Sequence, residues 1–467
     1  MTIASLLRTA IPKTAIASAI AMGLTLGCAN PSFAGNREKA WHIYQRLTGT
    51  PPTNAVLDTM TACINNDTST CSTGGGDTTL KGTTVASAGE VQAAYLAMQD
   101  KNFLNVKVKN MVMPWTNKDQ TVFFPFNDAA ALLIGLIGEG KDFRQALYAD
   151  IYYDDPSVPS TYQFSPFVFP SSNLNPQSNN NHFEYIEHND LPLKSALVQT
   201  TQTGVTGMPA EGVAGVLTTR AMQRAFFYAG TNRAMLRFTF INFMCNDFSQ
   251  IKDITSNPDR IRQDPSRSPG GDSSVFLNNC IGCHAGMDGL AGAFSYYNWG
   301  PAVYNPDIPA DTQGSVYASS ANPNFTLSGK DIPPTRVMPK YLQNFLSFPY
   351  GYQTKDDSWI NYWRVGLDAN LGWLNNSTPH VISYDPSTPG PYASEPGNSS
   401  MGSAAQLGYE LANTEAFARC QVLQVYRHTC LNDPSDTAMS QIVGDFKANN
   451  YNMLTVFSDA AASCSGN

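Results

Sequence analysis

The segment that decides how this chain of 467 residues is built is Cys280-Ile281-Gly282-Cys283-His284. Two cysteines separated by two residues and followed at once by a histidine form the attachment pattern of c-type haem. On a helical turn each thiol can add to one vinyl group of the haem, and the histidine then lies beneath the iron as an axial ligand. We therefore expect one covalently bound haem c, held by Cys280, Cys283 and His284.

Three other uses of this pattern stay open. A structural zinc site needs two further ligands at a matching spacing, and the sequence has no second Cys-x-x-Cys and no His pair. A dithiol redox motif usually opens a helix in a thioredoxin-like βαβ pattern, which the flanking sequence lacks. A plain disulfide between Cys280 and Cys283 is compatible with the spacing.

Residues 1–34 have the pattern of an export signal peptide. Arg8 and Lys13 supply a positive start, an apolar stretch follows, and small residues precede a cleavage site before Gly35. A rival cleavage before Cys28 would place a lipid anchor on that cysteine, although the residues in front of it fit a lipoprotein signal less well. No other stretch approaches ~18 consecutive apolar residues. We expect an exported bacterial protein, periplasmic or on the cell surface, without a transmembrane segment.

The composition excludes two broad classes of protein. Hydrophobic residues make up 42% and aromatic residues 11% of the chain, which is too much for a mainly disordered protein. The 37 acidic residues outnumber the 29 basic ones, and Lys and Arg form no run. Nucleic-acid binding is therefore not expected, because phosphate contacts need clustered positive charge.

Apolar residues recur at helical spacing in several parts of the chain, and polar segments rich in Pro, Ser, Asn and Gly separate them. We expect a mainly α fold: a cytochrome-c-like haem module embedded between helical domains, with long polar loops. The expected domains are 35–190, 191–400 and 401–467. The expected helices are 91–98, 127–137, one or two within 211–245, 273–279, 416–428, 439–446 and 453–462. Short β-pairs are expected at 106–112 and 121–126.

Five segments resemble a known family. They are AWHIYQRLTGTPP (40–52), FRQALYAD (143–150), GVAGVLT (212–218), CIGCHAGMDGL (280–290) and LANTEAFARC (411–420). Their order resembles that of the large haem proteins first noticed in planctomycetes, in which a cytochrome-c module lies among several domains of unknown function. Asp288-Gly289 stands here where that family usually has Asp-Pro. The resemblance implies an exported haem protein.

The sixth ligand of the iron decides between electron transfer and chemistry on a bound molecule. Met338, followed by Pro339 and a predicted helix, is the expected ligand, because a Met before Pro downstream of the motif is common in small cytochromes c. Met113 is a rival far upstream, and Met287 is too near His284 to cross the haem plane. An open sixth position is a further alternative. The histidines that remain as alternatives are His42, His182, His188, His380 and His428.

Two expectations concern the surroundings of the haem. Aromatic side chains follow the motif and are candidates for a wall between porphyrin and water, which would raise the reduction potential. They are Phe294, Tyr296, Tyr297 and Trp299. A backbone carbonyl is expected to accept the second ring N–H of His284.

Export predicts that the six mature cysteines outside the motif form disulfides. Cys63 and Cys71 enclose a short polar loop and are expected to pair. Cys420 and Cys430 lie about 15 Å apart along one predicted helix, too far for a disulfide. An antiparallel return of the last helix would bring Cys464 to Cys430, which leaves Cys245 for Cys420.

Three functions are compatible with these features. A single Cys-x-x-Cys-His favours an electron-transfer protein over a catalyst, with a redox partner protein that the sequence does not identify. A haem enzyme of peroxidase or oxygenase type is the alternative. A surface-binding or structural protein is a third possibility that no motif supports.

Overall fold

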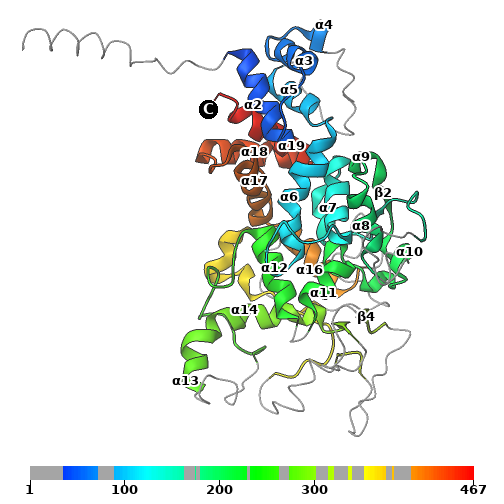
Figure 1. Cartoon of the computed structure of the whole chain (residues 1–467). Helices are drawn as coiled ribbons and strands as arrows, with labels where there is room; N and C mark the ends of the chain where they lie inside the picture. Colours follow the sequence, from blue (N-terminus) through cyan, green and yellow to red (C-terminus); the bar gives the residue numbers. More distant parts are fainter. Residues whose placement is uncertain are drawn as a thin grey trace, which may run out of the picture.

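The computed structural model of the chain describes residues 35–71, 89–161, 174, 179–228, 232–261, 273–300, 314–319, 335–338, 352–374, 381–382 and 401–466. Within these ranges the protein is mainly helical, as the sequence predicts, and contains two small two-stranded sheets (Figure 1). The predicted signal peptide, Cys28, His380 and Pro339 lie outside the described residues.

The described residues before position 200 form eight α-helices, together with short 3₁₀ and π segments. The α-helices described there are α2 (Asn36–Thr48), α3 (Asn54–Ile64), α4 (Thr68–Cys71), α5 (Glu90–Ala97), α6 (Lys109–Val112), α7 (Asp128–Gly138), α8 (Asn181–His188) and α9 (Leu193–Ala196). The other helical segments are η2 (Phe103–Val108), η3 (Met113–Thr116) and η4 (Phe143–Leu147).

The second half begins with short helical turns and ends in four longer helices. Its described α-helices are α10 (Gln202–Thr206), α11 (Arg220–Phe226), α12 (Arg233–Met244), α13 (Ser273–Val275), α14 (Ile281–Ala291), α16 (Ser403–Ala412), α17 (Glu415–Cys430), α18 (Asp436–Ala448) and α19 (Met453–Ser463). The other helical segments are η5 (Ala210–Gly212), η6 (Gly215–Thr218), η9 (Phe276–Cys280), η10 (Gly292–Phe294), η12 (Tyr362–Arg364) and η13 (Gly366–Leu371).

The helices expected from apolar spacing are confirmed. Segment 91–98 corresponds to α5, 127–137 to α7, and the three C-terminal predictions to α17, α18 and α19. The region 211–245 contains α11 and α12, and Thr219 is the N-cap of α11. The segment before the haem motif is helical, as α13 and η9.

The two predicted β-pairs are wrong. Segment 106–112 lies in η2 and α6, and segment 121–126 has no regular structure. β-Branched residues such as Val106 and Val108 suggested strands, but these residues pack as helix beside α7, where tertiary contacts outweigh a weak strand preference. The strands observed are β1 (Tyr152–Asp154) antiparallel to β2 (Val198–Thr200), and β3 (Tyr297–Trp299) antiparallel to β4 (Ser315–Tyr317).

Helix α7 lies at the centre of the molecule (Figure 1). Asn127 caps its N-terminus, because the side-chain oxygen accepts the backbone N–H of Ala130 at 3.1 Å. Every residue from position 128 to position 137 is buried, which explains the nearly continuous apolar sequence. Gly135 lets the ring of Tyr153 in β1 pack directly on the helix backbone.

The N-terminal and C-terminal segments pack together. Helix α19 contacts α2 and α5 as well as α17 and α18, and the end of the chain lies beside α2 in Figure 1. Nδ1 of His42 in α2 is 3.1 Å from the carbonyl oxygen of Ser465. One hydrophobic core includes residues of all three predicted domains, so the domain boundaries stay predictions.

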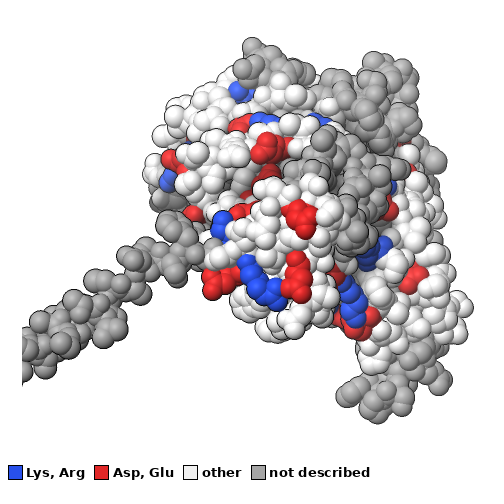
Figure 2. Space-filling model, turned by 90° about the horizontal axis from the view of Figure 1, so that it is seen from above, with Lys and Arg blue, Asp and Glu red and all other residues white. Residues whose placement is uncertain are grey.

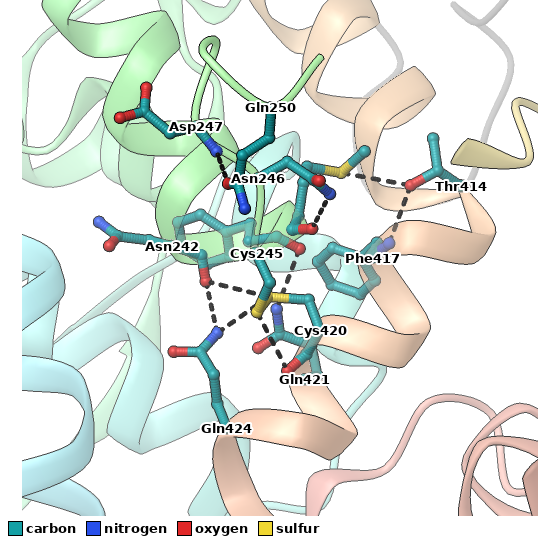
Figure 3. The surroundings of a disulfide bond; sticks show 12 residues. Asn242, Cys245, Asn246, Asp247, Gln250, Thr414, Phe417, Cys420, Gln421 and Gln424 are labelled. Carbon is teal, nitrogen blue, oxygen red and sulfur yellow. Dashed lines mark hydrogen bonds between the residues drawn. A yellow bond between two sulfur atoms is a disulfide. The ribbon is translucent and has the colours of Figure 1, made fainter. Parts of the chain in front are cut away.

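The structure forms the three disulfides that the sequence predicts: Cys63–Cys71, Cys245–Cys420 and Cys430–Cys464. The second of these joins the C-terminal end of α12 to α17 (Figure 3). Around it, side chains of α17 satisfy the last carbonyl groups of α12. Gln424 donates to the carbonyl of Asn242 at 2.7 Å, and Gln421 donates to that of Phe243 at 3.2 Å.

On the face drawn in Figure 2 the described surface carries few charges, and the two signs are mixed. Figure 2, seen from the end of the molecule where α3 and α4 lie, shows acidic and basic side chains interspersed among uncharged ones. Within the described ranges, no helix combines the length and apolarity that a membrane crossing requires.

Candidate haem site

The predicted attachment motif straddles the junction of two helical segments. Cys280 is the last residue of the π-helical turn η9, and Ile281 begins α14. His284 therefore lies on the first turn of α14, whose remaining residues are mostly small or apolar. The two cysteines and the histidine are thus on one helical turn, as thioether attachment requires.

Glycine lets α14 pack tightly on the segment that precedes α16. A β-carbon at Gly286 would overlap the indole ring of Trp363, and one at Gly289 would lie 2.8 Å from the carbonyl oxygen of Ile360. Proline also carries a β-carbon, so a proline at position 289 would meet the same clash. The face of α14 that carries these glycines is therefore closed by protein.

A buried ion pair holds the segment behind α14. Arg364, at most 1% exposed, donates to Glu410 of α16, with 2.8 Å between Nε and Oε1, and Asn361 donates to the same oxygen at 2.7 Å. Trp363 lies between Asn361 and Arg364 in the sequence, and its ring packs against Phe240 of α12. The position of α14 thus depends on side chains more than seventy residues away in the sequence.

Cys280 and Cys283 are the two unpaired cysteines of the described chain, and both are partly exposed. The Cys283 thiol donates to the carbonyl oxygen of Phe248 at 3.2 Å, and burial raises its pKa. All six other described cysteines form disulfides. The plain disulfide between Cys280 and Cys283 is therefore not formed. The residues that the structure describes also contain no group of three or more His, Cys, Asp or Glu side chains arranged to hold a metal ion.

The histidine of the motif contacts a carboxylate. Nδ1 of His284 lies 3.2 Å from both carboxylate oxygens of Asp288, one helical turn further along α14. Arg233, the first residue of α12, forms a two-pronged ion pair with the same carboxylate: Nε is 2.7 Å from Oδ1 and Nη2 is 2.9 Å from Oδ2. The expectation of a backbone carbonyl partner for His284 is thus wrong, because a side chain four residues on occupies that position.

Asp288 is ionised in this setting. Its side chain is only 6% exposed, and burial opposes the charge. The charge of Arg233 and the hydrogen bond with His284 outweigh burial and lower the pKa to about 2. If His284 bound a metal ion, the carboxylate on Nδ1 would make Nε2 the coordinating nitrogen, which is the arrangement found at many metal-bound histidines.

The donor set therefore fits haem c: two thiols and an oriented imidazole on one helical turn. An apolar side chain also stands beside it. Leu277, one turn before Cys280 in η9, leaves 55% of its surface exposed.

The aromatic residues that follow the motif lie in the core. Phe294 and Tyr297 contact Phe227 of the α11 region, and Tyr296 and Tyr297 contact Tyr317 of β4. All three are buried, as is Trp299, which lies below the guanidinium of Arg220. Their contacts are those of ordinary core packing, and their predicted role as a haem wall stays a prediction.

Met338 is buried in a small cluster with Tyr296, Ala318 and Val337. Its backbone N–H donates to the carbonyl oxygen of Ser295 at 2.9 Å. Ser295 follows His284 by eleven positions, which is about 16 Å along a helix. The structure thus places Met338 beside the far end of the helix and does not bring it to the His284 imidazole.

Except for Met287, the alternative axial ligands lie in elements other than α14. Met113 is buried in η3, and Met287 is buried one turn beyond His284. His42 contacts Ser465, His182 accepts from the backbone N–H of Asp155, and His428 contacts the carbonyl of Lys107. Burial lowers the pKa of His182, and burial together with Lys107 lowers that of His428 to about 4. His188 ends α8.

Sequence reasoning missed Asp288 and Arg233. The spacing of four between His284 and Asp288 on one helix was a usable signal. Arg233 carried none, because its helix is 55 residues away from Asp288 in the chain.

Comparison with protein-family models, with curated proteins and with solved structures finds no match to this chain.

Proposed function

We propose that this protein is an exported c-type haem protein that carries one haem and transfers single electrons. Cys280 and Cys283 would bind the haem through thioether bonds, and His284 would bind its iron. The observation that carries the proposal is a pair of unpaired thiols beside a histidine on one helical turn, in a chain whose other described cysteines are all in disulfides. Bound haem supplies an iron that gains and loses one electron.

The protein's own residues would fix the position of the haem and exclude water from one side of it. Trp363 and Ile360 close the glycine face of α14, and the Arg364–Glu410 pair holds them there. Asp288 orients the imidazole of His284. A fixed ligand geometry favours electron transfer, because little of the surroundings must rearrange when the charge of the iron changes.

The setting of the proposed function is outside the cytoplasm. Three disulfides and the sequence of residues 1–34 support export, to the periplasm or the cell surface of a bacterium, with Cys28 as an alternative lipid-anchor site. The electron donor and acceptor would be redox partner proteins. The resemblance to the planctomycete haem proteins is compatible with this assignment.

A haem enzyme of peroxidase or oxygenase type is the second candidate, and two observations favour it. Met338, the sixth ligand expected from the sequence, is buried beside Ser295 and away from His284. The Asp288 carboxylate on His284 strengthens the imidazole as a donor, which favours higher oxidation states of iron. An open sixth position would follow if Met338 keeps this place in the haem-loaded protein.

Optical spectra of the purified haem protein with and without carbon monoxide separate the two candidates. The electron-transfer proposal expects a six-coordinate haem that does not bind carbon monoxide. It also expects a weak far-red sulfur-to-iron band in the ferric protein, which Met338→Ala removes and the matched buried variant Met113→Ala retains. Rapid carbon monoxide binding by the wild type would contradict electron transfer as the main function and support the enzyme.

A further inference from the structure

Three charged or titratable side chains from two helices meet on the Nδ1 side of His284, the proposed iron ligand. His284 and Asp288 come from α14, and Arg233 comes from the first position of α12. Each oxygen of Asp288 faces both partners: Oδ1 and Oδ2 lie 3.2 Å from Nδ1 of His284 and 2.7 and 2.9 Å from the guanidinium. The carboxylate is thus shared between an imidazole and a cation.

Helix α12 is anchored at both ends, which fixes the position of Arg233. Asn232, which precedes Arg233 in a left-handed conformation, donates its side-chain amide to the carbonyls of Phe294 at 2.7 Å and Tyr297 at 2.9 Å. The other end of α12 is tied to α17 by the Cys245–Cys420 disulfide (Figure 3). Arg233 is therefore held relative to α14 at the start of its helix, by residues that follow α14 directly.

We propose that Asp288 and Arg233 are a pair of opposed positioning residues that set the reduction potential of the haem through His284. This inference rests on the proposed haem function. Asp288 accepts a hydrogen bond from Nδ1–H, orients the ring and makes Nε2 a stronger donor, which stabilises the ferric state. Arg233 donates to the same carboxylate and partly neutralises its negative charge, which weakens this effect. The net donor strength of His284 is a balance between the two.

The balance predicts shifts of opposite sign. Asp288→Asn removes the negative charge while keeping an acceptor for Nδ1, so the ferrous state gains stability and the midpoint potential rises. Arg233→Gln removes the opposing positive charge, so the carboxylate acts more strongly on His284 and the potential falls. A merely structural role would expose the haem to water in both variants and move both potentials downward.

The test is a spectroelectrochemical titration of the full-length haem-loaded protein and its variants. Each single variant is expected to change the ferric–ferrous equilibrium at least about tenfold, which corresponds to about 59 mV for one electron. The double variant Asp288→Asn/Arg233→Gln is expected to lie between the singles, and it keeps the test decisive if Asp288→Asn alone folds poorly. Arg427→Gln and Asp433→Asn alter an exposed ion pair at the end of α17 and serve as controls. Their equilibria are expected to change less than about twofold, because solvent screens exposed charges.

Each outcome is decisive. Shifts of the same sign in both single variants, or changes as small as those of the controls, would overturn the opposed pair and leave the haem assignment standing. A wild-type protein without covalent haem would overturn the proposed function and this inference together.

Discussion

In the C-terminal helices α17 and α19, Cys430 and Cys464 are buried and joined by a disulfide, whereas Cys280 and Cys283 at the start of α14 are partly exposed and unpaired. The two regions also pack differently. Helix α19 buries large side chains such as Phe457, which contacts Phe103. Helix α14 buries glycines against a segment that a polar ion pair holds in place.

The two regions differ in what stabilises them and, under the proposed function, in whether they bind a group. The C-terminal helices are held by disulfide and apolar burial, both of which are present without a bound group. Helix α14 leaves two thiols and a histidine on one turn, and its backbone is positioned by other segments. Under the proposed function α14 would accept a large group on one face, and the Arg364–Glu410 pair would then support the helix from its glycine face.

Replacing the cysteines of the two regions gives the largest contrast. Cys280→Ser together with Cys283→Ser is expected to abolish covalent haem completely, because no thiol remains for the thioether bonds. Haem staining of the protein band after denaturing electrophoresis measures this directly. Cys430→Ser together with Cys464→Ser is the matched control: haem is retained, and stability falls by about 2–4 kcal/mol. Haem staining that persists in the Cys280/Cys283 variant would refute the attachment site.

Removing the buried ion pair behind α14 is expected to have the next largest effect. Glu410→Gln leaves the Arg364 charge without its carboxylate in a buried position, and should lower the free energy of unfolding by about 3–5 kcal/mol. Chemical denaturation measures this loss. Glu415→Gln, which alters the exposed pair with Lys447, is the control and should cost less than about 1 kcal/mol. Equal effects of the two variants would show that α14 does not depend on this support.

The smallest effect is a pH dependence in the C-terminal helices. Burial and the nearby Asp445 raise the pKa of Asp459 to about 7, whereas an unfolded aspartate has a pKa near ~3.9. The folded state therefore favours the protonated carboxyl, and this contribution is complete below about pH 4 and is lost as the pH rises through 7. Asp459→Asn should remove about 1–2 kcal/mol of this pH dependence, with thermal unfolding at pH 4, 6 and 8 as the measurement.

Asp433→Asn is the control for this experiment. Its hydrogen bond with Arg427 lowers the pKa of Asp433, so its contribution changes in the opposite direction, being lost as the pH falls. A stability profile of Asp459→Asn that parallels the wild type from pH 4 to 8 would contradict the raised pKa of Asp459.

The sequence alone determined the local features of this protein. Apolar spacing and caps located α5, α7, α17, α18 and α19, because each helix is encoded within its own dozen residues. Two of the three disulfides followed from those helices, since a continuous α17 forbids one pairing and an antiparallel α19 favours another. The third, Cys63–Cys71, followed from the short loop that these cysteines enclose. The spacing of the motif likewise located the candidate haem cysteines and His284 before any fold was known.

Only the tertiary structure decided what surrounds the motif. The Arg233–Asp288 contact and the Arg364–Glu410 pair join residues 55 and 46 positions apart, and no periodicity in the sequence records such pairs. Met338 illustrates the same limit: its Met-Pro context predicts an iron ligand, but its location is decided by the residues that pack on it, Tyr296 and Ala318. Spacing along a chain determines which residues share a helical turn, whereas contacts between distant segments depend on how all the helices pack at once.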